Sequence, residues 1–234
     1  MRYFSFDQQA ESYVSCALAQ RVFAQTLVLE IAERLGRGFD RVADLGSGSG
    51  ELQAIFNQEG IAYQEFEACD ISSKMLHLYP KTHNTQVFCQ DFDVFLQRGG
   101  DYDLVCSSSA LQWARDLSMT LERISLQTQN VGLCIITDRT FGSLHRFLGT
   151  FSPLLSTHRV MELLERYFDG YMRIKCIELQ MQDSREIMTH LRRSGVMGGG
   201  VLGYNQAKKM LQFQGSLEYE AVIFVGKSKN KETK

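Results

Sequence analysis

The sequence predicts an α/β fold with a mostly parallel sheet and helices on both of its faces. The first observation is the stretch 41–50, RVADLGSGSG, where a short apolar run ends in an acid and glycine then occupies every second position. Residues 51–59 follow with a helical pattern, so the stretch predicts a strand, a glycine loop and a helix of the nucleotide-binding kind. The second observation is that strand-like and helical stretches alternate along residues 42–137, which is typical of a parallel sheet.

The elements follow in order from this alternation. Up to residue 137 we expect five strands, at 42–44, 66–70, 86–89, 103–107 and 132–137. The helices expected in the same region are 51–59, 73–78 and 117–127. They are preceded by helices at 7–13 and 17–35.

After residue 138 the regular alternation of strand-like and helical stretches ends, and helical stretches dominate. We expect helices at 141–151, 157–168, 184–193 and 205–213, with strands at 171–180 and 217–225. No repeat, low-complexity segment or linker interrupts the chain, which predicts a single domain over residues 1–234. Within it, residues 1–40 form N-terminal helices, and residues 139–170 and 184–214 form a helical lid or substrate region.

Composition narrows the class of protein. The chain has 44% hydrophobic and 22% charged residues, ordinary values for a globular domain. There is no apolar run of about 18 residues and no signal-peptide pattern, so we expect a cytoplasmic protein that does not bind a membrane. Six cysteines without a C-x-x-C pair predict buried thiols and no metal site. A net charge of −2 fits poorly with nucleic-acid binding.

The spacing of the glycine loop distinguishes two kinds of ligand. A dinucleotide fingerprint starting at Gly46 would require a third glycine at position 51, where the chain has Glu51. An acid followed by G-x-G-x-G instead resembles motif I of the class I S-adenosylmethionine (SAM) methyltransferases. That resemblance implies cofactor binding by Asp44, Gly46, Ser47, Gly48 and Gly50. The alternative is that the loop is only a tight turn between a strand and a helix.

Two further acids follow successive strands. Asp70 lies 20 residues after Gly50, where a carboxylate can accept hydrogen bonds from ribose hydroxyls, with Ile71 beside it. The alternative for Asp70 is an N-cap of the helix near residue 73. Asp91 and Phe92 follow the third strand. In the methyltransferase pattern they hold the adenine, although an acid after a strand is also a common turn residue.

The fourth strand ends at the edge of the sheet where such folds place reacting groups. Ser107 is therefore a cofactor candidate, and Gln112 and Trp113 are substrate candidates. Trp113 is the only tryptophan, and its alternative is simple packing. A Pro-Pro-Tyr-type motif of enzymes that methylate exocyclic base nitrogens is absent from this stretch.

Three segments together resemble one family. They are 110–113 (ALQW), 141–147 (FGSLHRF) and 191–196 (LRRSGV), supported by the N-terminal spacing of Phe6, Ala10, Tyr13 and Gln20. They are similar to the malonyl-[acyl-carrier protein] O-methyltransferases of biotin synthesis over nearly the whole chain. The resemblance implies a Rossmann-like class I methyltransferase fold with a seven-stranded, mostly parallel sheet and a helical insertion after the fifth strand. The chain departs from the usual Gly-x-Gly-Pro-Gly form of the loop, which acts through its backbone.

The resemblance also implies a reaction, transfer of the SAM methyl group to the free carboxylate of a malonyl thioester on acyl carrier protein. A carboxylate is already ionised at neutral pH, so positioning suffices and no general base is expected. To orient the acceptor we expect Arg139 and Arg146 beyond the fifth strand, with Tyr13 closing the site.

The carrier protein is acidic, so its docking requires exposed cations. The candidates are Arg192, Arg193, Lys208 and Lys209, and we expect a monomer. Two alternatives stay open. One is a methyltransferase of a small free carboxylic acid, which would need several cations in its pocket. The other is a non-methylating assembly or regulatory protein on the same fold.

Overall fold

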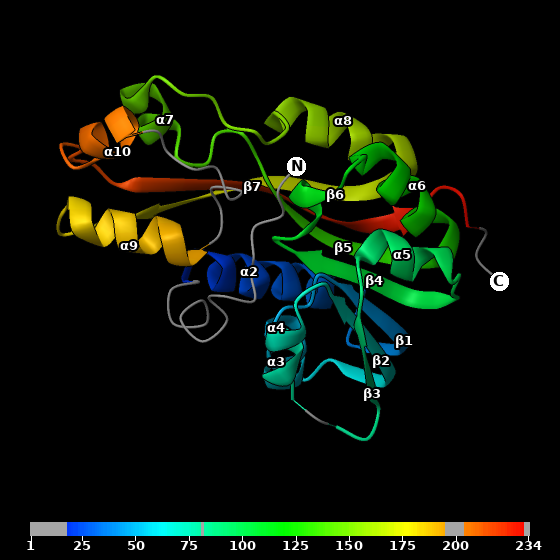
Figure 1. The fold of residues 1–234 in the computed structure, drawn as a ribbon. Coiled ribbons are helices and arrows are strands. Elements are labelled where there is room, and N and C mark those ends of the chain that lie inside the picture. Colours follow the sequence, from blue (N-terminus) through cyan, green and yellow to red (C-terminus); the bar gives the residue numbers. More distant parts are fainter. Residues whose placement is uncertain (1–17, 81, 195–203, 232–234) are drawn as a thin grey trace.

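A seven-stranded sheet forms the centre of the protein in the computed structural model, which describes residues 18–80, 82–194 and 204–231 (Figure 1). Its strands are β1 (Gly38–Leu45), β2 (Ala62–Asp70), β3 (Thr85–Cys89), β4 (Tyr102–Ser108), β5 (Thr128–Ile136), β6 (Phe168–Leu179) and β7 (Leu217–Ser228). Their order in space is β3-β2-β1-β4-β5-β7-β6. The first five strands are parallel, and β7 runs antiparallel to both β5 and β6. The predicted fold class is confirmed.

Two apolar clusters bury the two faces of this sheet. The first joins it to α2 (Leu18–Arg34), α3 (Glu51–Gln58), α7 (Gly142–Leu148), α9 (Ser184–Ser194) and α10 (Tyr204–Met210). The second joins it to α5 (Phe92–Gln97), α6 (Leu117–Gln127) and α8 (Thr157–Tyr167). Val42 of β1 lies in the first cluster and Ala43 in the second, since successive strand residues face opposite sides.

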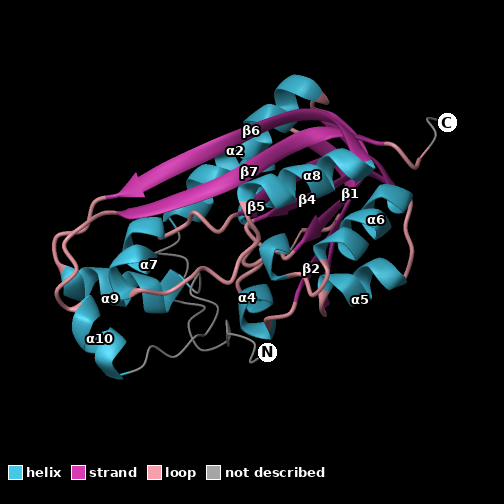
Figure 2. Cartoon of the chain, turned by 90° about the horizontal axis from the view of Figure 1, so that it is seen from above, coloured by secondary structure: helices cyan, strands magenta, loops and turns pink. Residues whose placement is uncertain are grey.

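The long antiparallel strands β6 and β7 extend the sheet toward one end of the molecule. Figure 2 shows them reaching over α7, α9 and α10, which gather at that end. The two predicted helical regions lie on either side of β6: α7 and α8 precede it, and α9 and α10 lie between β6 and β7. β6 begins at Phe168, so its first residues fall inside the region expected at 139–170.

Two differences from the predicted elements have physical causes. β1 begins at Gly38 and not at residue 42, because its backbone already pairs with β2 from Gly38 onward. Arg41 is accommodated within the strand by ion pairs to Glu65 and Glu67 of β2. The helix α5 was not predicted, because Asp91, which is its N-cap, is also a common turn residue after a strand. The expected helix 7–13 lies outside the described residues.

The predicted burial of the cysteine thiols is confirmed for three of the five described cysteines and wrong for the other two. Cys69, Cys106 and Cys134 are buried, whereas Cys89 and Cys176 are exposed. Among the described helices, none combines the length and the apolar character that a membrane crossing requires.

The register of the sheet places the predicted motifs at one edge. Asp44 of β1 pairs with Ala68 of β2 on one side and with Cys106 of β4 on the other. The chain reverses its direction of winding between β1 and β4, and in open α/β sheets ligands bind at the carboxyl ends of the strands at such a point.

A buried carboxylate links helix α2 to β6, the outermost strand on one side of the sheet. Glu30 of α2 accepts hydrogen bonds of 2.8 Å from Arg34 of the same helix and from Arg173 of β6. The Arg34 guanidinium also lies 3.5 Å from the ring centroid of Tyr171. Helix α2 is thus held against β6 as well as against the core.

We predict that Glu30→Ala lowers the free energy of unfolding by about 2 kcal/mol, because two charge-assisted hydrogen bonds are lost while both arginines stay partly hydrated. Urea unfolding measures the change. Glu33→Ala, an exposed position of the same helix, is the control and should stay within about 0.5 kcal/mol of the parent. Equal effects of the two substitutions would contradict the anchoring role.

Candidate active site

The glycine loop turns tightly in a conformation that favours glycine. Gly46, Gly48 and Gly50 have φ angles of 72°, 55° and 91°. A Cβ at Gly46 would lie 2.2 Å from the Cβ of Ala110, and one at Gly50 would lie 2.9 Å from Cδ of Pro80. A Cβ at Gly48 would meet nothing within 4 Å. Two glycines are thus required by close packing, and the third leaves the backbone open on one side.

The end of β2 holds this loop in place. The amides of Gly46 and Ser47 both donate to the carbonyl of Cys69 at 2.9 Å. The amide of Gly48 donates to Oδ2 of Asp70 at 2.8 Å, and Oδ1 of Asp70 accepts from the amide of Ser72 at 2.8 Å. Asp70 therefore orients the loop.

The N-cap of the following helix α4 (Ser73–His77) is Ser72, whose hydroxyl accepts from the amide of Met75. The N-cap alternative for Asp70 is therefore wrong. Contact of Asp70 with a ribose stays a prediction.

The remaining cofactor candidates occupy the same edge in different ways. Ile71 follows β2 and is 51% exposed, so its side chain is available to a ligand. Asp91 is the N-cap of α5 and accepts from the amide of Asp93 at 2.8 Å, while Phe92 is half-buried. The hydroxyl of Ser107 is buried and donates to the carbonyl of Leu45 at 2.7 Å, which joins β4 to β1. The side chain of Ser107 thus stabilises the edge from within.

Asp44 is the buried charge of this site. It is 1% exposed, and neither carboxylate oxygen has a hydrogen-bond partner among the described residues. Burial, and then the charge of Asp70, raises the pKa of Asp44 well above its usual range. A buried carboxyl without partners is destabilising. A cationic ligand with N–H donors would relieve it, and the α-ammonium group of SAM is such a ligand.

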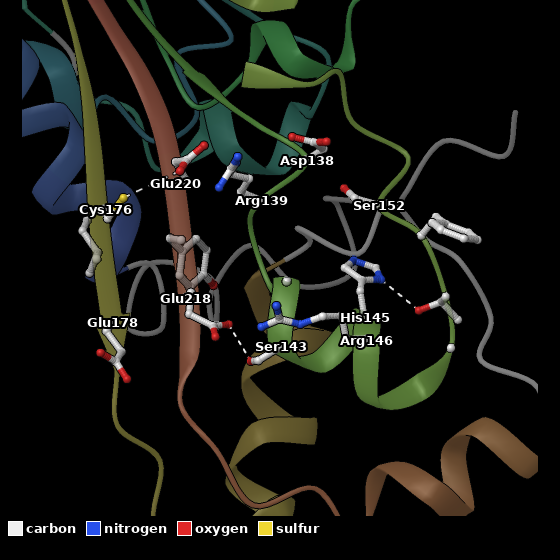
Figure 3. Close-up of a pocket in the computed structure, with 16 residues that line it drawn as sticks. Asp138, Arg139, Ser143, His145, Arg146, Ser152, Cys176, Glu178, Glu218 and Glu220 are labelled. Carbon is white, nitrogen blue, oxygen red and sulfur yellow. Dashed lines mark hydrogen bonds between the residues drawn. The ribbon is translucent and has the colours of Figure 1, made fainter. Parts of the chain in front are cut away.

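A pocket of about 960 Å³ opens beyond the carboxyl end of β5. Figure 3 shows Arg139, from the loop after β5, and Arg146, from α7, on its wall opposite glutamates of β6 and β7. Both arginines are exposed, and neither forms an ion pair in the described part of the chain. The structure thus brings the two predicted acceptor residues into one pocket.

Hydroxyl groups hold the acidic side of the pocket. Oε1 of Glu220 accepts from the hydroxyls of Thr137 and Thr157, and Oε2 of Glu218 accepts from Ser143 at 2.7 Å. Asp138 and Glu178 also line the pocket. The two strand glutamates thus accept hydrogen bonds from hydroxyl groups, and within the described residues neither forms an ion pair with Arg139 or Arg146.

The other substrate candidates lie away from this pocket. Gln112 and Trp113 belong to the short 3₁₀ helix η2 (Leu111–Trp113) after β4. The Gln112 amide nitrogen donates to the carbonyl of Ser109 at 2.6 Å, and its Oε1 is buried without a partner among the described residues. Trp113 is half-buried. Tyr13 lies outside the described residues.

Of the docking candidates, Lys208 and Lys209 are exposed on α10. The Lys209 ammonium lies 5.2 Å from the ring centroid of Phe147, which places α10 against α7. Arg192 and Arg193 belong to α9, and the structure does not describe their side chains.

Sequence reasoning missed three residues near these sites. Glu218 and Glu220 alternate on the last strand, so the period of two could have placed both on one face. Tyr79, beside the glycine loop, carries no motif and precedes a proline, which resembles an ordinary end of a helix.

The comparisons with known proteins agree with this geometry. A family model described as "Methyltransferase domain" matches residues 17–192. The chain is 32% identical to the malonyl-[acyl-carrier protein] O-methyltransferase of Chlorobium luteolum over 209 residues, covering 82% of this chain and 76% of that protein.

Two solved structures share the fold. The YcgJ protein from Bacillus subtilis has a TM-score of 0.61 at 13% identity, over 89% of this chain and 99% of that chain. The plantazolicin methyltransferase BpumL, solved in complex with SAH, has a TM-score of 0.54 at 15% identity, over 93% of this chain and 89% of that chain.

The fold, the loop and the family model define the class: this is a methyltransferase that uses S-adenosyl-L-methionine. Within that class the chain belongs to the malonyl-[acyl-carrier protein] O-methyltransferase family.

We predict that Asp44→Asn stabilises the unliganded protein at neutral pH and weakens SAM binding. Folding raises the pKa of Asp44, so as the pH rises above about 4 the unfolded chain loses this proton first and the folded state becomes relatively less stable. The gain in Tm should therefore be largest near pH 8 and shrink toward pH 5. Thermal unfolding with and without SAH measures both effects.

Asp40→Asn, at an exposed position of the same strand, serves as control and should show neither trend. A lower Tm for Asp44→Asn at neutral pH would show that the carboxylate is satisfied in the free protein.

Proposed function

We propose that this enzyme transfers the methyl group of SAM to the free carboxylate of a malonyl thioester carried on acyl carrier protein, an early step of biotin synthesis. The observation that carries the proposal is the pair Arg139 and Arg146, free of ion pairs in the described chain and lining one pocket at the edge of the sheet. Family membership supports the same acceptor.

The chemistry requires positioning more than side-chain reactivity. The acceptor carboxylate is ionised at neutral pH and is itself the nucleophile, so no general base has to be present. We assign the cofactor to the glycine loop with Asp44, Asp70 and Asp91, and the acceptor carboxylate to Arg139 and Arg146. SAM, when bound, supplies an electrophilic methyl group, and the protein aligns the two partners and excludes water.

The charges of the pocket favour this acceptor over a small di- or tricarboxylic acid. Four carboxylates and two arginines line the pocket, and burial lowers the pKa of His145, which keeps it neutral. This surplus of negative charge opposes any anion, and it opposes a ligand with two or three carboxylates more strongly than a ligand with one. A thioester presents a single carboxylate at the end of a neutral acyl group, which two arginines can neutralise.

Docking of the carrier protein is assigned to the exposed cations near this end of the molecule. Lys208 and Lys209 lie on α10, which packs against α7, and α7 contributes Arg146 to the pocket. Arg192 and Arg193 complete the proposed surface. An acidic carrier would thus approach beside the pocket that receives its acyl group.

We predict that Arg139→Gln and Arg146→Gln each raise KM for malonyl-carrier protein about tenfold, the effect of losing one charge-assisted contact. SAH affinity should not change. Transfer of a labelled methyl group and calorimetry with SAH provide the two measurements. Arg166→Gln, an exposed arginine of α8 outside the pocket, is the matched control. An unchanged KM in both variants would refute the acceptor assignment.

Reversing the charges of Arg192, Arg193, Lys208 and Lys209 should reduce methylation of malonyl-carrier protein far more than methylation of malonyl-CoA, because only the first needs a protein surface. Steady-state rates on both substrates give the comparison. Equal losses would contradict the docking role.

If the folded parent protein bound SAH but transferred no methyl group to either substrate, the non-methylating alternative would be favoured.

A further inference from the structure

A buried tyrosine hydroxyl lies beside the glycine loop. Tyr79 follows α4 and is 4% exposed, and its hydroxyl has no hydrogen-bond partner among the described residues. Buried tyrosine hydroxyls are normally hydrogen-bonded, since an unsatisfied one is destabilising. The hydroxyl therefore indicates a ligand that supplies its hydrogen-bond partner.

The position of Tyr79 relates it to the cofactor loop and not to the acceptor pocket. Two atoms of its ring would lie 3.1 and 3.2 Å from a Cβ on Gly50, so the ring packs directly against the loop. Tyr79 also belongs to the apolar cluster that contains Val42, two residues before Asp44 on the same face of β1. Burial raises the pKa of the Tyr79 hydroxyl most, and the negative charge of Asp44 raises it further. The second effect indicates that Tyr79 and Asp44 lie near each other.

Tyr79 and two further buried polar groups next to Gly46–Gly50 lack partners in the described chain. The others are the Asp44 carboxylate and the hydroxyl of Ser47, which is 7% exposed. They come from three segments: the end of β1, the loop itself and the turn after α4. One carboxylate and two hydroxyls can together accept from an ammonium group and donate to a carboxylate.

These groups complement the amino-acid end of SAM. The adenosine end is assigned to Asp70 and Asp91, which follow β2 and β3, on one side of β1. Asp44 and Tyr79 occupy the face of β1 beneath the loop, and of the parts of SAM only the α-amino-acid end offers both a cation with N–H donors and an anion. The sulfonium group offers no N–H or O–H donor.

We propose that Tyr79 is a cofactor-binding residue whose hydroxyl forms a hydrogen bond with the α-amino-acid group of bound SAM, next to the charge of Asp44. The proposal depends on SAM as the cofactor and is independent of the identity of the methyl acceptor. It also gives the hydroxyl group a function. Hydrophobic packing alone does not require that group, because a phenylalanine would fill the same space.

The test compares Tyr79→Phe with the parent protein by calorimetry on two ligands. SAH carries the amino-acid group, and 5′-methylthioadenosine carries the same adenosine and sulfur without it. We expect Tyr79→Phe to weaken SAH binding about tenfold and to leave 5′-methylthioadenosine binding unchanged. The unliganded variant should unfold at a temperature no lower than the parent, because an unsatisfied buried hydroxyl has been removed.

Tyr102→Phe is the matched control, since Tyr102 is also 4% exposed but donates to Glu67 at 3.1 Å, at the start of β4. It should lose stability and keep its SAH affinity. Unchanged SAH affinity in Tyr79→Phe, as expected if only a buried water satisfies the hydroxyl, would overturn the proposal. Equal weakening of both ligands would overturn it as well. Neither readout uses an acceptor, so failure here is distinguishable from failure of the proposed reaction.

Discussion

The hydrogen bond from the Gly48 amide to the Asp70 carboxylate is the contact on which the cofactor site depends. It joins the loop after β1 to the end of β2, and the amides of Gly46 and Ser47 reinforce it by donating to Cys69. Three consecutive amides of the loop are thereby directed toward β2. The loop keeps its left-handed turns because its neighbours Ala110 and Pro80 leave no room for side chains.

This arrangement places unfavourable electrostatics at the centre of the protein. Asp44 is buried and has no hydrogen-bond partner within residues 18–80, 82–194 and 204–231, and Asp70, a second carboxylate, raises its pKa further. A sequence selected for stability alone would place an apolar residue there. Groups that destabilise the free protein and suit a ligand are typical of binding sites, where function is retained at the expense of stability.

Sequence reasoning could assign to one edge of the sheet those candidate residues whose position follows from local rules. The glycine spacing, the acids after successive strands and the arginines beyond β5 all depend on which residue follows which strand, and parallel strands bring their carboxyl ends to one edge. Tyr79 and Glu220 could not be found in this way. Tyr79 meets Gly50 only through the packing of α4, and Glu220 reaches the pocket because β7 returns antiparallel beside β5. Helix α5 was missed because Asp91, its N-cap, is a residue type that equally favours a turn after a strand.

The same strand order explains how one edge can serve both partners of the reaction. The glycine loop, our proposed cofactor site, follows β1, whereas the proposed acceptor pocket begins after β5, two strands away, or about 10 Å at the usual strand spacing. Between them lies the end of β4, with Ser109 in a left-handed conformation and η2 directly after it. A methyl group carried from the loop toward β5 must cross this segment, where Gln112 holds a buried acceptor oxygen without a partner in the described chain. The segment after β4 therefore lies between the glycine loop and the pocket beyond β5.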